Sequence, residues 1–185
     1  FYGTTDVTRT LSLQNNNKRI KDIYTRVLKG HIAVANYRIN KKTTGSEIDR
    51  CARRYLNAFN LDYNHGTGHG VGYFYNVHEG PLSISKFSNG NFEKGMVLSN
   101  EPGYYEKNKF GIRIENLVAV NENSKNLFFE NLTMVPIDKD LINKRLLSKN
   151  EIKWLDNYHR NVFLNLKKFM KKQERKKLKI YCSKI

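Results

Sequence analysis

The chain has 185 residues, of which 39% are apolar and 12% aromatic, so it can bury a hydrophobic core and is not a disordered polypeptide. Its net charge is +16, and residues 167–179 alone hold eight basic residues and one acid. This concentration favours a solvated basic tail over a groove that binds nucleic acid. We also expect no membrane association, because no apolar run approaches the ~20 residues of a membrane helix.

The cysteines indicate the cellular compartment of the protein, and the first residues indicate whether the sequence is part of a longer one. Cys51 and Cys182 lie far apart without CxxC spacing, which favours a reducing, cytoplasmic compartment over a disulfide framework. The opening FYGTTDVTRT contains neither an initiator Met nor the apolar core of a signal peptide. We therefore expect this chain to begin inside a longer sequence, either as a fragment or processed product of a longer protein or as a truncated remnant.

The hydrophobic pattern predicts an α+β domain. Period-two alternation or short apolar runs predict strands over residues 3–13, 96–99, 111–120 and 127–135. Helical spacing predicts one helix over residues 18–37, with His31 structural or exposed. Capping boxes, Thr44 with Glu47 and Ser148 with Glu151, predict the starts of two more helices. We expect a domain over residues 1–136 and a helical extension with a basic tail over 137–185.

Residues 64–81, NHGTGHGVGYFYNVHEGP, concentrate the chemistry of the chain. Three of the five histidines, His65, His69 and His78, lie here. Glycines alternate with larger residues between His65 and Tyr73, so the backbone can approach another group closely. The ordinary alternative is a loop whose imidazoles bond to backbone, but this composition is more typical of imidazoles converging on a metal or a substrate.

Three acids lie on or at the ends of predicted strands: Asp6, Glu101 and Glu115. For Asp6, its own stretch of sequence alone favours an ordinary acid at the end of a turn, hydrogen-bonded to water. Arg113 shares a strand face with Glu115, so the guanidinium can orient that carboxylate. One imidazole with several carboxylates suits Mn²⁺, Co²⁺ or Zn²⁺, and bridging carboxylates allow two ions about 3.5–4 Å apart.

Several segments in this order resemble the catalytic domain of aminopeptidase P, the Xaa-Pro aminopeptidases. The segments are GTTDVTRT, HGTGHGVG, VHEGP, NEPGYY and GIRIEN, spanning Gly3 to about Val120. The resemblance implies the pita-bread fold that prolidase and methionine aminopeptidase share. We therefore expect a curved mixed or antiparallel sheet flanked by helices, incomplete at its N-terminal end.

The resemblance also implies roles for individual residues. His65 and His78 would contact substrate and stabilise the transition state, and Glu101 would shuttle the proton of the attacking water. Arg113 would hold the acids in place and face the substrate together with the histidines, and Thr8 would be a supporting hydroxyl. The implied metal ligands are Asp6, His69, Glu101 and Glu115, and His65, His69, His78 and Arg113 are the implied substrate-binding residues.

The implied activity is removal of the N-terminal residue from peptides with proline in second position, through a hydroxide that bridges two divalent ions. Mn²⁺ is favoured, and Zn²⁺ or Co²⁺ is compatible. The expected partner is such a peptide, a homodimer is compatible with the family, and nucleic acid is disfavoured.

One departure from the family pattern concerns the metal set. The family has another metal aspartate about one strand upstream of Asp6, which would precede Phe1, and a proton-shuttling histidine further upstream. Neither Asp22 nor Glu93 is placed to substitute. We expect this segment to bind at most one metal tightly and to be poorly active or inactive by itself.

Other functions remain open at this point. A pita-bread domain can be a non-catalytic binding module, or the chain can belong to a prolidase-like dipeptidase or a methionine aminopeptidase. Nucleic-acid binding through Lys167–Lys179 would show a steep salt dependence. Phosphate-loop, simple zincin and serine-hydrolase functions lose support, because GxxxxGK[ST], HExxH and GxSxG are absent from the sequence.

Overall fold

The computed structural model describes residues 3–13, 17–74 and 76–185 and divides into two compact units. We call them the sheet unit, which comprises the residues up to Thr10 and Arg26–Thr133, and the helical unit, which comprises Leu11–Thr25 and Met134–Ile185. The expected division into 1–136 and 137–185 stays a prediction. Across the described ranges, no helix combines the length and the apolar character needed to cross a membrane.

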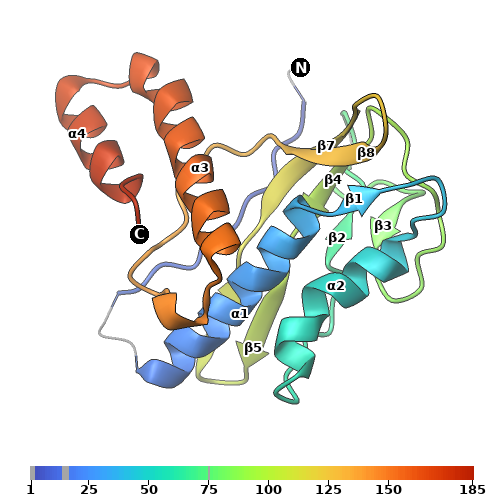
Figure 1. The fold of residues 1–185 in the computed structure, drawn as a ribbon, viewed down its shortest axis with the longest axis horizontal. Coiled ribbons are helices and arrows are strands. Elements are labelled where there is room, and N and C mark those ends of the chain that lie inside the picture. The colour runs from blue at the N-terminus through green and yellow to red at the C-terminus, as the bar shows by residue number, and fades with distance from the viewer. Residues whose placement is uncertain (1–2, 14–16, 75) are drawn as a thin grey trace. The chain divides into compact units, whose positions relative to one another are not determined.

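An antiparallel four-stranded sheet forms the centre of the sheet unit, in the order β1-β8-β7-β4 (Figure 1). Two smaller pairs, β2–β3 and β5–β6, accompany it. The strands are β1 Arg38–Ile39, β2 Gly68–His69, β3 Ser83–Ile84, β4 Val97–Asn100, β5 Gly103–Glu106, β6 Phe110–Arg113, β7 Asn116–Glu122 and β8 Leu127–Asn131. The predicted strands at 96–99 and 127–135 correspond to β4 and to the shorter β8.

Two helices pack on one face of this sheet: α2, Gly45–Asn57, and the part of α1, Lys18–Ala35, that follows Thr25 (Figure 1). The core between helices and sheet is aliphatic with two phenylalanines, which meet edge to face at 5.7 Å. It contains Val34, Ile39, Ile48, Ala52, Leu82, Ile84, Phe92, Leu98, Val118, Val120 and Phe129. Gly30 does not interrupt α1. A Cβ at this position would lie 2.7 Å from the carbonyl oxygen of Ala52 on α2. The glycine therefore permits close contact of the two helices.

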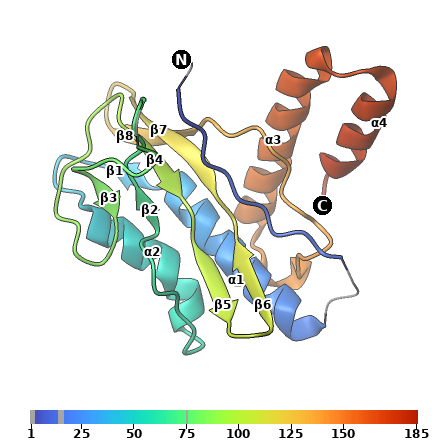
Figure 2. The same cartoon turned by 180° about the vertical axis from the view of Figure 1, so that it is seen from behind.

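Two predicted strands differ in the structure. The segment 3–13 makes a single bridge, between Thr8 and Glu115, because the Thr10 hydroxyl bonds both backbone groups of Arg113 and replaces a regular ladder (Figure 2). The segment 111–120 divides between β6 and β7, since Arg113 pairs with Gly103 of β5 and Asn116 pairs with Asn100 of β4. Burial extends to both faces of this segment: Ile112, Ile114 and Val118 are buried, and so are Glu115 and Leu117.

The helical unit contains α3, Lys149–Leu166, and α4, Lys172–Tyr181, with short 3₁₀ turns at Lys144–Leu146 and Lys167–Phe169. The α3 helix begins at the predicted Ser148–Glu151 capping box, as α2 begins at Thr44–Glu47. Most of residues 167–179, the predicted basic tail, form α4, and most of them are exposed to solvent. The helix packs back on α3 through the buried Leu178.

Candidate metal centre

His69 lies at the end of β2 and is the centre of the site. Its backbone N–H donates to the Ser99 hydroxyl at 2.9 Å, and that hydroxyl donates to Glu101 Oε1 at 3.0 Å. Gly68, just before it, permits this approach to β4, because a Cβ there would lie 2.0 Å from the Ser99 carbonyl oxygen. The glycine-rich sequence therefore brings the imidazole close to the strand that ends at Glu101.

The proton of His69 can be assigned from its neighbours. Nδ1 lies 2.8 Å from the Gly70 carbonyl oxygen, which can only accept a hydrogen bond, so Nδ1 carries the proton. In the neutral imidazole Nε2 presents a lone pair, and this atom lies 3.4 Å from Asp6 Oδ2 and 3.3 Å from Glu101 Oε1. The atom is buried and has no hydrogen-bond donor among the described residues. A lone pair that faces two carboxylates is stabilised by a cation between them.

Glu115 completes the cluster. It is buried, at 2% exposure, and accepts a hydrogen bond from the Thr8 hydroxyl. Burial raises the pKa of Glu115, and the nearby charges of Glu101 and Asp6 raise it further. The Thr8 hydroxyl therefore contacts one of the predicted ligands, and the three acids share one small region.

The donors fall into two groups of three that share His69. One group is Asp6, His69 and His78, and the other is His69, Glu101 and Glu115. Within each group one ligand atom from each residue lies within 4.8 Å of the others. Asp6, His69, Glu101 and Glu115, predicted from separate segments, thus meet in one place. This donor set, carboxylate oxygens with imidazole nitrogen, fits divalent cations such as Mn²⁺ or Zn²⁺.

Arg113 and Tyr105 form the polar edge of the cluster. Arg113 Nη1 lies 3.7 Å from Glu101 Oε2, and its Nε donates to the Tyr105 hydroxyl at 2.7 Å. Tyr105 was not predicted from the sequence. The sequence contained a signal for it, because Glu101, Gly103 and Tyr105 are alternate residues. Alternate residues of an extended segment lie on the same face.

The two remaining histidines occupy different positions. The His78 ring meets that of His69 edge to face, with centroids 3.9 Å apart. His65 Nδ1 donates to the Gly66 carbonyl at 2.7 Å, so Nε2 accepts from the Tyr105 hydroxyl at 2.9 Å. Burial lowers the pKa of His65, which favours this neutral form. Donation from His65 Nε2 to a substrate oxygen would require the ring to release Tyr105 and take up a proton.

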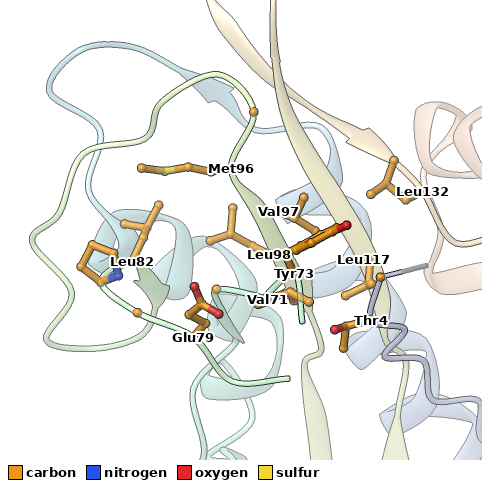
Figure 3. A pocket seen from close by; sticks show the side chains of 16 residues that line it. Thr4, Val71, Tyr73, Glu79, Leu82, Met96, Val97, Leu98, Leu117 and Leu132 are labelled. Atoms are coloured by element: carbon orange, nitrogen blue, oxygen red, sulfur yellow. The ribbon is translucent and has the colours of Figure 1, made fainter. Parts of the chain in front are cut away.

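A largely apolar cavity of about 540 Å³ is lined in part by residues 70–73 and 79–82 of the glycine- and histidine-rich segment (Figure 3). Val71, Val97, Leu117 and Leu132 form much of its wall. None of the four predicted ligands lines it, so we place the chemistry at the carboxylate cluster and not in the cavity.

Comparison with known proteins gives a consistent result. The pattern of metallopeptidase family M24 matches residues 1–122, and that of the C-terminal region of peptidase M24 matches residues 125–185. A probable Xaa-Pro aminopeptidase P of Phaeosphaeria nodorum is 46% identical over 178 residues, which cover 90% of this chain and 27% of that protein. The Xaa-Pro aminopeptidase 1 of Dictyostelium discoideum is 46% identical over 86% of this chain and 27% of that protein.

Two solved structures extend the comparison. The X-prolyl aminopeptidase of Caenorhabditis elegans, described as a cytosolic enzyme with a di-nuclear active site, matches with a TM-score of 0.93 at 42% identity. It covers 99% of this chain, which spans 32% of that structure. A Xaa-Pro dipeptidase from Bacillus anthracis matches with a TM-score of 0.64 at 31% identity, over 72% of this chain and 36% of that one. The chain has the pita-bread fold, and it spans about a quarter to a third of the length of these proteins.

Proposed function

Because the chain belongs to metallopeptidase family M24, we propose that the protein of which it forms part removes the N-terminal residue from peptides with proline in second position. One observation carries the proposal: the buried Nε2 of His69 faces the carboxylates of Asp6 and Glu101 at 3.4 and 3.3 Å and has no hydrogen-bond partner among the described residues. The similarity to Xaa-Pro aminopeptidases over 86% or more of the chain supports the choice of substrate class.

We propose that the centre of the whole protein holds two divalent cations, with Mn²⁺ favoured and Zn²⁺ or Co²⁺ compatible. Asp6, His69, Glu101 and Glu115 would hold them, since these side chains contribute to the two donor groups around His69. When bound, such cations lower the pKa of water and polarise a carbonyl group. Glu101 is our candidate for accepting the proton of the attacking water, because its carboxylate lies against both His69 and Arg113.

His65, His78 and Arg113 would face the substrate. The His78 ring packs edge to face against that of His69, and His65 is connected to the centre through Tyr105 and Arg113. These side chains would orient the scissile carbonyl and donate to the charge that develops on its oxygen. A tertiary amide to proline has no N–H, so recognition of that bond rests on shape and on the free N-terminal amine.

The test uses the whole protein loaded with Mn²⁺. We expect it to release the first residue of an Xaa-Pro-Yaa tripeptide. We expect His69→Ala to lose its bound Mn²⁺, measured by elemental analysis, and also its turnover. We expect His78→Ala to lower kcat while Mn²⁺ stays bound. Two Mn²⁺ retained in His69→Ala, or the loss of Mn²⁺ in His78→Ala, would contradict these assignments.

A prolidase-like dipeptidase is the second candidate, because the Xaa-Pro dipeptidase structure shares 31% identity and the fold. It would cleave an Xaa-Pro dipeptide and leave the tripeptide intact, so the same assay with both peptides separates the two activities. A non-catalytic binding module would cleave neither. The retained set of acids and histidine gives this alternative less support.

The remaining expectations concern the segment and its surroundings. We propose that the 185-residue segment alone, which supplies four of the five ligands expected from the family, holds at most one Mn²⁺ tightly and is poorly active or inactive. Two tight sites in a calorimetric titration would contradict this. A cytoplasmic location is consistent with cysteines that are unpaired in the structure, and light scattering of the whole protein would test for a homodimer.

A further inference from the structure

A buried ion pair lies on α2, away from the metal ligands themselves. Arg53 Nε donates to Asp49 Oδ2 at 2.8 Å, one helical turn away, and the two side chains are 3% and 0% exposed. Burying two charges costs several kcal/mol per ion unless the remaining hydrogen-bonding groups are also satisfied. The partners of those remaining groups therefore indicate what the pair does.

The free side of the guanidinium bonds the loop over residues 61–67. Nη1 donates to Asp62 Oδ1 and to the Tyr63 carbonyl, both at 2.7 Å, and Nη2 donates to the His65 carbonyl at 2.6 Å. The guanidinium carbon also lies 3.9 Å from the centroid of the Tyr63 ring. Arg53 thus holds the segment that ends at His65 at three points.

Asp49 holds the other side of the same loop. Thr67 Oγ1 donates to Asp49 Oδ1 at 2.6 Å, and the Tyr63 hydroxyl lies 2.5 Å from Thr67 Oγ1. Arg53 therefore binds the backbone before Gly66, and Asp49 binds the side chain after it. Asp49, Arg53 and the loop over residues 61–67 are thus joined by a closed ring of hydrogen bonds, which we call the α2 clamp.

The α2 clamp adjoins the candidate centre at two points. The His65 ring contacts the Tyr105 hydroxyl at 2.9 Å, and the Thr67 carbonyl accepts the backbone N–H of Glu101 at 2.8 Å. Gly66 gives this short loop backbone freedom, so external bonds are needed to fix the direction of the His65 side chain.

We propose that Arg53 is a positioning residue that fixes His65 toward the substrate by holding its backbone carbonyl, with Asp49 as its counter-charge. The proposal rests on the proposed function, in which His65 faces the substrate. Arginine suits this position because its planar fork reaches a carboxylate and several carbonyls at once. The single ammonium of a lysine cannot reach Asp49, Tyr63 and His65 together.

The test is a double-mutant cycle in the whole Mn²⁺-loaded protein, assayed on an Xaa-Pro-Yaa tripeptide. We expect Arg53→Lys and His65→Ala each to lower kcat/KM by about tenfold or more, and the double variant to lose no more than His65→Ala alone. The matched control is Arg54→Lys, the same change at the next, exposed residue, which keeps the wild-type kcat/KM. Multiplicative losses in the double variant would overturn the proposal, because Arg53 would then act independently of His65. A wild-type kcat/KM in Arg53→Lys would overturn it too.

Hydrogen exchange separates this proposal from the proposed function. We expect the amides of residues 62–67 to exchange at least tenfold faster in Arg53→Lys than in wild type and Arg54→Lys, whether or not the protein cleaves peptides. Unchanged exchange at these amides would overturn the proposed role of Arg53. Faster exchange in a protein that cleaves no peptide would contradict only the proposed function. Should Arg53→Lys not fold, Asp62→Ala removes one anchor at a residue whose side chain is 38% exposed, and it must show the same coupling to His65→Ala.

Discussion

The burial of His31 predicts a specific loss of stability in mild acid. His31 is fully buried on α1. Its Nδ1 lies 3.2 Å from the Asn100 carbonyl oxygen, and Asn100 Nδ2 donates back to the His31 carbonyl at 3.0 Å. Burial, together with the positive charge of Arg9, lowers the pKa of His31 from 6.5 to about 3. The sequence left open whether this histidine was structural or exposed, and it is structural.

The sign and the size of the effect follow from linkage. In the unfolded chain His31 takes up a proton near pH 6.5, whereas in the folded chain it stays neutral until about pH 3, so acid favours the unfolded state. The stabilisation is complete above pH 6.5 and is lost as the pH falls toward 3. Each pH unit in this window costs about 1.4 kcal/mol, so lowering the pH from 6.5 to 5 costs about 2 kcal/mol. This is a large part of the roughly 5–15 kcal/mol that stabilises a typical protein.

Urea unfolding of the metal-free protein, followed by circular dichroism between pH 7 and 5, measures this slope. His31→Gln keeps a donor for the Asn100 carbonyl and removes the titration, so its free energy of unfolding should change about 2 kcal/mol less across pH 6.5 to 5 than that of wild type. The raised pKa of Glu115 contributes with the opposite sign, because its stabilisation is lost as the pH rises, and the comparison between variants removes that contribution. Equal slopes in both proteins would refute the reasoning.

Three other changes test the core and the centre. Gly68→Ala places a Cβ 2.0 Å from the Ser99 carbonyl oxygen, so we expect it to separate β2 from β4 and to weaken Mn²⁺ binding by at least tenfold in a calorimetric titration. Leu98→Ala empties a fully buried position and should lower the free energy of unfolding by about 2–5 kcal/mol, whereas Leu164→Ala, at a 47% exposed position, should lower it by less than about 0.5 kcal/mol. A saturating divalent cation at 1,000 times its dissociation constant should stabilise the chain by about 4 kcal/mol, measured as a shift in urea midpoint that EDTA reverses and His69→Ala abolishes.

The sequence singled out side chains that lie close together in the structure, but it misplaced the strands that carry two of them. Asp6 was placed on a regular strand and Glu115 in the middle of another, and both placements were wrong. Asp6 lies on an extended segment with one bridge, and Glu115 lies between β6 and β7. Local alternation cannot reveal where a strand changes partner, because the change depends on which distant segment supplies the hydrogen bonds. The ligand assignments came from motifs and not from element boundaries, so they were unaffected by these errors.

The supporting contacts were the part that sequence patterns could not supply. Tyr105 carries a periodic signal, but Arg53 looks like any charged residue on an amphipathic helix until its four acceptors are located. Each acceptor belongs to a segment whose path is set by tertiary contacts. Spacing along the chain therefore identifies candidate ligands, and only coordinates identify the residues that orient them.

The distribution of charge shows why the net charge says little about the centre. The helical unit holds eighteen basic and six acidic residues, so it accounts for +12 of the total +16, and the sheet unit, which contains every candidate ligand, accounts for +4. Within the centre the sign is reversed, because Asp6, Glu101 and Glu115 gather around one imidazole lone pair. Arg113, at 3.7 Å from Glu101, offsets only part of that charge. A chain whose formal charge favours anions thus builds a centre that stabilises cations, and the residues within a few ångströms decide which ligand binds there.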